Sequence, residues 1–121
     1  MSPLALVTGA AHRLGKAFAL TLARHGFDIA LHYHHSLDAA LQTRAEIESV
    51  GRSVTFAQAD LTDAAQISSL LSKIDSLQVL VNSAAFMPSG NVDALSLENW
   101  DTSLDLNLRA PFCWRKSVPR K

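Results

Sequence analysis

A glycine-containing stretch near the start of the chain could bind a phosphate. Residues 5–16 read ALVTGAAHRLGK, an apolar run followed by Gly9, Gly15 and Lys16. Glycines directly after a strand allow backbone N–H groups and the first turn of the next helix to contact phosphate oxygens. The phosphate could belong to a nucleoside triphosphate or to a dinucleotide. A third interpretation is that the glycines only make a tight turn between a strand and a helix.

The spacing in this loop favours a dinucleotide over a triphosphate. A P-loop needs four residues between its glycines and a Ser or Thr after its lysine, because that hydroxyl binds the magnesium ion of the triphosphate. Here five residues separate Gly9 from Gly15, and Ala17 follows Lys16. The loop lacks the magnesium ligand, so the pyrophosphate of a dinucleotide is the better fit.

The histidine-rich stretch some twenty residues further on indicates which dinucleotide. An NAD site places an acidic residue there on the adenosine ribose, whereas an NADP site leaves room for a 2′-phosphate. Residues 29–37 contain no Asp or Glu, and His34, His35 and Ser36 stand there instead. Arg13 could reach the same place from the glycine loop. This combination favours NADP(H).

Two other interpretations of the histidines stay open. His32 and His34 alternate along an expected strand, so they lie on one side of it, as two metal ligands could. No third ligand with suitable spacing follows, and we therefore expect no metal site. The histidines could also be ordinary polar residues at the end of a strand.

Hydrophobic periodicity predicts alternating strands and helices. Strands are expected over residues 3–8, 28–33, 53–58 and 78–82, and helices follow them. The first helix ends at Gly26, the second begins after Ser36, the third is capped by Thr62 or Asp63, and the last begins at Ser96. The expected apolar stripes are Leu14, Ala17, Phe18, Thr21 and Leu22 in the first helix, Ala40, Thr43, Ile47 and Val50 in the second, Ile67, Leu70, Leu71 and Ile74 in the third, and Leu97, Trp100, Leu104 and Leu108 in the last. Such alternation predicts an α/β fold in which helices cover both faces of one parallel sheet.

Composition narrows the classes of protein. The chain of 121 residues is 48% hydrophobic and carries eleven basic and eleven acidic residues, which suits one domain over residues 1–121 without a surface for nucleic acid or membrane. The single Cys113 cannot form an internal disulfide, and the first residues do not resemble a signal peptide. We therefore expect a cytoplasmic protein that acts on a small molecule.

Four motifs, in order and spacing, resemble the short-chain dehydrogenase/reductase family over residues 4 to 114. Residues 8–15, TGAAHRLG, are similar to its T-G-x-x-x-G-x-G loop, with Arg13 in place of the middle glycine. Asp60-Leu61 resembles its pair at the adenine, residues 82–85 (NSAA) resemble its N-N-A-G, and Asn107 resembles its active-site asparagine. The resemblance implies a Rossmann-type doubly wound sheet, in which the third, second, first and fourth strands lie side by side in that order, and an oxidoreductase that uses NADP(H). The implied cofactor-binding residues are Gly9, Arg13, Leu14, Gly15, His34, His35, Ser36, Asp60, Leu61, Asn82 and Ala84.

The arginine in the loop and the LHYHHS segment are similar to the pteridine-reductase branch of the family. In that branch an Arg at this place and a His-x-Ser segment contact the NADPH phosphates, which implies a carbonyl or pterin-like substrate for the full-length enzyme. Three positions depart from the pattern: His35 stands where that branch often has Arg, Ser83 replaces the second Asn of N-N-A-G, and Ala85 replaces its Gly. The first departure bears on 2′-phosphate affinity, and the others bear on packing beneath the adenine ribose.

The position of Asn107 four residues before a proline is a second feature, and it is independent of the resemblance. Residue 111 is proline and has no N–H to donate to the carbonyl of Asn107, so we expect a kink in the helix and a free carbonyl. In the family this asparagine ties a water molecule to the catalytic lysine. The alternative is a packing kink with a solvated side chain.

The family's Ser and Tyr-x-x-x-Lys pair, which move the substrate proton, have no counterpart in this sequence. Tyr33 is the one tyrosine, and Leu37 stands four residues after it. We expect a cofactor-binding half that is truncated after the fourth strand and its helix and is inactive alone. The alternatives are a non-catalytic NADP(H)-binding or sensor module and an inactive fragment. We also expect a homo-oligomer, or aggregation through the exposed edge of the sheet.

Overall fold

The computed structural model describes residues 2–88 and 90–117, and its centre is a parallel sheet. The strands are β1 (Leu4–Val7), β2 (Asp28–Tyr33), β3 (Val54–Gln58) and β4 (Val79–Val81), in the spatial order β3-β2-β1-β4. All three pairings are parallel, with Leu6 opposite both Ala30 and Leu80. The expected strand order is confirmed, and β2 has the bounds that the sequence predicts.

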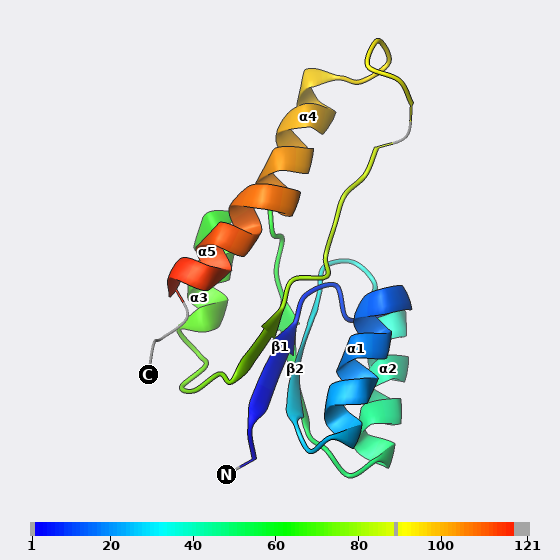
Figure 1. The fold of residues 1–121 in the computed structure, drawn as a ribbon, viewed down its shortest axis with the longest axis vertical. Coiled ribbons are helices and arrows are strands. Elements are labelled where there is room, and N and C mark those ends of the chain that lie inside the picture. Colours follow the sequence, from blue (N-terminus) through cyan, green and yellow to red (C-terminus); the bar gives the residue numbers. More distant parts are fainter. Residues whose placement is uncertain (1, 89, 118–121) are drawn as a thin grey trace.

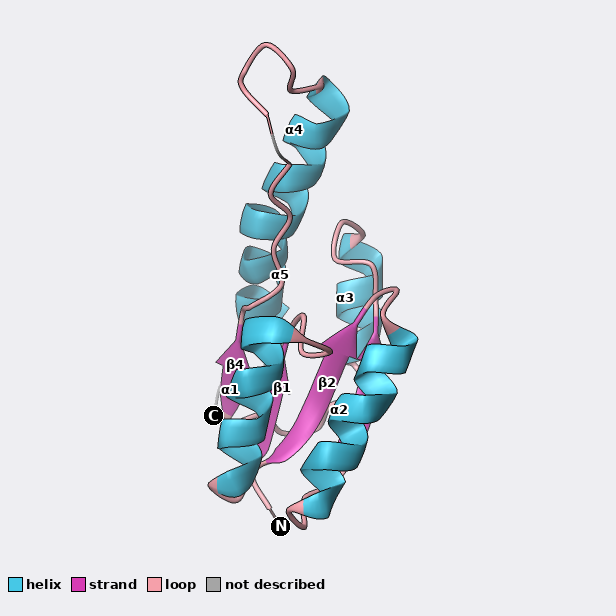
Figure 2. Ribbon diagram, turned by 90° about the vertical axis from the view of Figure 1, so that its right-hand side faces the viewer, coloured by secondary structure: helices cyan, strands magenta, loops and turns pink. Residues whose placement is uncertain are grey.

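Helices cover both faces of this sheet (Figures 1 and 2). One face carries α1 (Arg13–Arg24) and α2 (Leu37–Ser49). The other carries α3 (Ala64–Leu71) and a long rod made of α4 (Leu97–Leu104), the π-helical segment η1 (Asp105–Arg109) and α5 (Ala110–Ser117). The α/β fold class is therefore confirmed.

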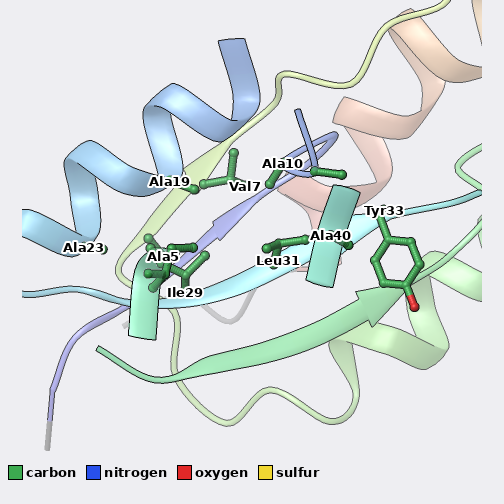
Figure 3. Close-up of a cluster of buried hydrophobic side chains, with 11 residues drawn as sticks. Ala5, Val7, Ala10, Ala19, Ala23, Ile29, Leu31, Tyr33 and Ala40 are labelled. Carbon is green, nitrogen blue, oxygen red and sulfur yellow. The ribbon is translucent and has the colours of Figure 1, made fainter. Parts of the chain in front are cut away.

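The face under α1 and α2 is packed with small and aliphatic side chains (Figure 3). Ala5 and Val7 of β1 and Ile29 and Leu31 of β2 are fully buried there against Ala19. Alanines on the helices let them lie close to the strands, and strands that are buried on both faces are typical of parallel sheets. The expected stripe of α1 is wrong, because the helix turns Gly15, Ala19 and Ala23 toward the sheet and leaves Leu14, Ala17, Phe18 and Thr21 exposed.

The buried stripe of α2 consists of Ala40, Thr43 and Ile47. Val50 was wrongly included in that stripe: it is the C-cap residue, where the chain leaves the helix, and it is 41% exposed.

The opposite face has a separate core centred on α3 and α5. Leu6 and Ala30 from the sheet pack with Ile67 and Leu71 of α3 and with Trp114 of α5, which is fully buried. Leu70 and Ile74 are partly buried beside them. Asp63 caps α3 by accepting a hydrogen bond from the N–H of Ala65, so the second of the two expected caps is the correct one.

The α4 end of the rod extends beyond the sheet (Figures 1 and 2). Ser96 caps α4 as expected, through a hydrogen bond from the N–H of Asn99. The apolar residues along the rod remain exposed, at 82% for Leu97, 52% for Trp100, 42% for Leu104, 67% for Leu108 and 61% for Phe112. None of the described helices is long and apolar enough to span a membrane.

Candidate functional site

A cleft of about 450 Å³ lies at the carboxyl ends of the strands. It opens where β1 has β2 on one side and β4 on the other, the place where parallel sheets of this order bind ligands. Nine of the eleven expected cofactor-binding residues belong to its lining: Gly9, Arg13, Leu14, Gly15, His34, His35, Ser36, Leu61 and Ala84. The remaining lining residues were not among the expected cofactor-binding residues; they are Ala11, His12, His32, Tyr33, Ser83, Ala85 and Leu106.

Both glycines of the loop are required by close backbone contacts. A Cβ atom on Gly15 would lie 2.2 Å from the carbonyl oxygen of Gly9, so only glycine lets α1 start this close to the loop. A Cβ atom on Gly9 would lie 2.9 Å from Cα of Ala84, and Gly9 also has a φ of +62°. The two glycines thus fix the loop between β1 and the segment after β4.

Arg13 occupies a backbone conformation that favours glycine. Its φ of +56° is the one positive value found among the described non-glycine residues. A left-handed conformation costs a residue with a Cβ roughly 1–2 kcal/mol, and such strain is concentrated at functional sites. The strained position is also the one at which the sequence has Arg in place of the middle glycine. This strained residue carries a positively charged side chain and lines the cleft.

The N-terminus of α1 is electrostatically suited to an anion. Its first-turn N–H groups point away from the helix body, its cap residue His12 makes no side-chain cap, and its first turn contains no acidic residue. Lys16 in the same turn is paired with Glu46 at 2.6 Å. Arg13 therefore supplies the charge at this helix start, because no ion pair involves it among the described residues.

His34 and His35 lie at the mouth of the cleft, directly after β2. Both are exposed, and their ring centroids are 3.7 Å apart. Ser36, the next residue, is the N-cap of α2, but its hydroxyl makes no capping bond. Three polar side chains in succession are therefore available to a ligand at this point.

His32 has a different environment that the sequence did not predict. It is 2% exposed and lies beneath the glycine loop, where its Nδ1 accepts a hydrogen bond from the N–H of Gly9 at 2.9 Å. Its Nε2 is 2.9 Å from the carbonyl oxygen of Ala59. Both ring nitrogens are thus used by backbone groups, which leaves no lone pair for a metal. Among the described residues no group of three or more metal-ligating side chains occurs.

Burial lowers the pKa of His32 below its usual value of 6.5. The hydrogen bond to Ala59 acts in the opposite direction, and the nearby His34 lowers the pKa further. The imidazole is therefore neutral, with its proton on Nε2, because only an unprotonated Nδ1 can accept from Gly9. A histidine among the buried residues near the end of a strand is the sequence signal that could have revealed this role.

Thr8 joins the glycine loop to the segment after β4. Its Oγ1 accepts hydrogen bonds from the N–H groups of Ser83 and Ala84, each at 3.0 Å. These bonds hold the NSAA segment against the cleft despite Ser83 and Ala85 at the two positions that depart from the family pattern. Asn82 itself is exposed and does not line the cleft.

Asp60 and Leu61 follow β3, and Leu61 lines the cleft. Asp60 lies outside the lining, and its Oδ1 accepts bonds from Thr62, at 2.7 Å from Oγ1 and at 2.9 Å from the backbone nitrogen. The hydroxyl bond of Thr62 is the main reason why the pKa of Asp60 lies below its usual value. Asp60 is therefore an ionised residue that shapes the turn beside the cleft.

Asn107 lies in η1, the π-helical segment, and its exposed side chain is held by hydrogen bonds within the chain. It accepts from the N–H of Phe86 at 2.8 Å and donates to the carbonyl oxygen of Phe86 at 2.7 Å. A further bond reaches Oγ of Ser103 at 3.1 Å. The expected irregularity before Pro111 takes the form of this π-helical segment, a feature that is frequent at functional sites. Asn107 thus fixes the loop after β4.

Comparison with known proteins agrees with this geometry. The family described as short chain dehydrogenase matches residues 3–121. The chain belongs to the short-chain dehydrogenase family. Within this family, a 3-oxoacyl-(acyl-carrier-protein) reductase FabG of Staphylococcus aureus is 34% identical over 125 aligned positions, which cover 99% of this chain and 51% of that protein. A hydroxynaphthalene reductase of Aspergillus fumigatus is 32% identical, over 88% of this chain and 41% of that protein.

Solved structures of the short-chain dehydrogenase family share the fold. A short chain dehydrogenase from Burkholderia cenocepacia in complex with NADP superimposes with a TM-score of 0.91 at 32% identity, covering 96% of this chain and 49% of that one. The chain thus spans about half the length of the relatives that it matches.

Proposed function

We propose that this chain is the cofactor-binding part of an NADP(H)-dependent oxidoreductase that transfers hydride to or from a carbonyl or alcohol carbon. The observation that carries the proposal is the charge of the cleft. Its lining includes His12, Arg13, His34 and His35, and none of its described lining residues is Asp or Glu. An NADP site must avoid negative charge where the 2′-phosphate binds, and this cleft does so.

The residues present fit such a cofactor. The glycine loop and the first turn of α1, with Gly9, Leu14 and Gly15, would hold the pyrophosphate. Arg13, together with His34, His35 and Ser36, would hold the 2′-phosphate. The adenosine would lie between Leu61, beside the turn made by Asp60, and the segment that contains Asn82 and Ala84. When bound, the nicotinamide supplies or accepts the hydride.

Proton transfer requires residues other than those of this chain. Tyr33 is buried and packs edge-to-face on Phe56 at 5.2 Å, so its hydroxyphenyl ring belongs to the core rather than to a reaction site. Asn107 would take part in the proton relay through its backbone carbonyl, to which Pro111 cannot donate an N–H. We therefore expect the 121-residue chain alone to bind NADPH without catalysing steady carbonyl reduction.

A charge reversal at Arg13 tests the cofactor. Arg13→Glu places a carboxylate where the 2′-phosphate would bind, so it should abolish the preference for NADPH over NADH in calorimetric titrations of both. Arg24→Glu, at the far end of the same helix, is the control for a change of net charge and should keep the preference. Unchanged selectivity in Arg13→Glu would refute the 2′-phosphate assignment.

A non-catalytic NADP(H)-binding or sensor module is the second candidate. It requires only that the described cleft binds the dinucleotide. Both candidates bind NADPH, so titration does not separate them. Turnover by a longer protein that contains this chain would establish the oxidoreductase, and its absence would favour the module. An inactive fragment, the third alternative, would bind no dinucleotide.

The proposed class of substrate depends on Arg13, which stands in place of the middle glycine of the loop. Arg13 with the LHYHHS segment supports a relative of the pteridine reductases, with a pterin-like or other carbonyl compound as substrate. Reduction of a pterin by a longer protein that contains this chain, compared with a 3-oxoacyl thioester, would test this assignment.

We also propose that copies of this chain associate. β4 pairs with β1 on one side and has no described strand on the other, and the rod carries the exposed stripe from Leu97 to Phe112. Sedimentation at micromolar concentration should show species larger than a monomer. Leu108→Arg should shift them toward the monomer if the stripe contributes, whereas Val50→Arg on α2 is the control. A single monomer boundary for the unaltered chain would contradict association.

A further inference from the structure

The carbonyl and the imidazole of His32 both hold the glycine loop. Its backbone carbonyl oxygen accepts the N–H of Ala10 at 2.9 Å, and its Nδ1 accepts the N–H of Gly9 at the same distance. The N–H groups of Gly9 and Ala10, which are consecutive in the loop, are thus both hydrogen-bonded to His32 of β2. Because the imidazole also bonds to Ala59, the side chain connects the ends of β1, β2 and β3.

We propose that His32 is a positioning residue for the phosphate loop and that its protonation releases Gly9, so that NADP(H) binding weakens at acidic pH. This inference rests on the proposed function only for the identity of the ligand. A neutral imidazole accepts from Gly9 and donates to Ala59. A protonated imidazole has a second N–H on Nδ1, which would face the N–H of Gly9, and two donors cannot form a hydrogen bond.

The groups around His32 are mostly basic. His34 follows directly after its strand, and His12 and Arg13, at the start of α1, line the same cleft. Asp60 is the carboxylate that follows Ala59, and its Oδ1 is already engaged by Thr62. From α5, the uncharged ring of Trp114 lies edge-to-face at 6.5 Å. These surroundings favour the neutral ring, which is consistent with its lowered pKa.

The expected pH dependence has a sign opposite to that of ordinary phosphate-binding histidines. A histidine that contacts a phosphate directly binds it more tightly when protonated, so binding of an anionic ligand strengthens as the pH falls. Protonation of buried His32 would weaken it, because the loop loses its support. The sign of the effect therefore separates His32 from its exposed neighbours.

Long-range ¹H–¹⁵N NMR of the unaltered protein without ligand is the first measurement. At pH 7.5 we expect Nδ1 of His32 to be unprotonated and Nε2 to be protonated. As the pH falls, the amide of Gly9 should shift with the same midpoint as the His32 ring. A proton on Nδ1 at pH 7.5, or a Gly9 amide that does not follow the His32 titration, would overturn the positioning role.

NADPH titrations between pH 8 and 5.5 then test the consequence. His32→Asn keeps an oxygen acceptor close to the position of Nδ1 but cannot titrate in this range. The dissociation constant of the unaltered protein should rise relative to that of His32→Asn as the pH falls through the midpoint of the His32 ring found by NMR, by up to about tenfold, as expected for one lost hydrogen bond. Titration of the ligand phosphate is common to both proteins and cancels in this comparison.

The outcomes separate this inference from the proposed function. Equal pH profiles for the unaltered protein and His32→Asn would overturn the coupling to binding. An absence of NADPH binding at every pH would refute the proposed cofactor. In that case a joint titration of His32 and Gly9 would still support the positioning role, since it requires no ligand. If His32→Asn fails to fold, the NMR titration of the unaltered protein decides.

Discussion

The side chain of Asn107 and the backbone of Phe86 exchange two hydrogen bonds, of 2.8 Å and 2.7 Å. The side-chain amide of Asn107 thus forms with Phe86 the two hydrogen bonds that a neighbouring strand would otherwise form with a residue of this loop. This pairing connects the π-helical segment η1 to the loop that follows the cleft, although the two residues are 21 positions apart in the chain.

Asn107→Ala should therefore loosen the loop after β4. The variant loses both bonds to Phe86 and the bond to Ser103, so we expect a loss of about 1–2 kcal/mol in the free energy of unfolding. Amide hydrogen exchange at Phe86 should become faster. Asn99→Ala is the control, because its side chain makes no hydrogen bond within the described residues. Unchanged protection at Phe86 would contradict the role of the pairing.

Gly15→Ala should destabilise the protein although alanine favours helices. Gly15 lies in the first turn of α1, where the new Cβ would lie 2.2 Å from the Gly9 carbonyl oxygen. Backbone atoms cannot give way cheaply, so we expect a loss of more than about 3 kcal/mol in urea unfolding. Gly51→Ala is the matched control: its φ is +86° but nothing lies within 4 Å, so its cost should be about 1 kcal/mol. Equal costs would exclude steric contact as the cause.

Substitutions of Arg13 should reverse the usual helix preference. At a φ of +56° glycine is unstrained, whereas alanine retains the strain of a Cβ atom. We expect Arg13→Gly to be more stable than Arg13→Ala by about 1 kcal/mol in thermal or urea unfolding. Ala17→Gly in the body of α1 is the reference, where glycine should be less stable than alanine by a similar amount. An Arg13→Ala variant as stable as Arg13→Gly would argue against the left-handed conformation.

The turn at Asp60 should make stability depend on pH at the acidic end. Because the pKa of Asp60 is lowered below 3.8 in the folded state, its contribution is present above that value and is lost as the pH falls through the folded pKa. Thr62→Val removes the main cause of the shift, so the pKa of Asp60 should rise. The stability difference from the unaltered protein should be larger at pH 6 than at pH 2.5.

Carboxyl ¹³C shifts and urea unfolding at the two pH values provide the test. Thr55→Val, an exposed threonine on β3, is the control for the loss of a hydroxyl. A pKa of Asp60 that is the same in Thr62→Val would show that the Thr62 hydroxyl does not cause the shift.

The arrangement of the fold was largely predictable because it depends on local pattern. Alternation of buried strands with capped helices predicted the bounds of β2 and placed Ser36 and Ser96 at helix starts, and the strand order followed from the family resemblance. The glycine loop was equally predictable, because its chemistry resides in the types and spacing of consecutive residues. The family match over residues 3–121 agrees with the fold predicted from these local patterns.

Contacts between residues distant in the chain were decided only by the tertiary structure. Alternation along β2 placed His32 and His34 on one side, yet one is buried and the other is exposed, because the strand ends at Tyr33 and the segment at Ala59 covers only His32. The pairing of Asn107 with Phe86 and the exposure of Val50 likewise depend on where other elements pack. The sequence by itself determined that a phosphate loop follows the first strand, and the packed structure determined that a neutral histidine holds this loop, since burial and hydrogen-bond partners come from the assembled sheet.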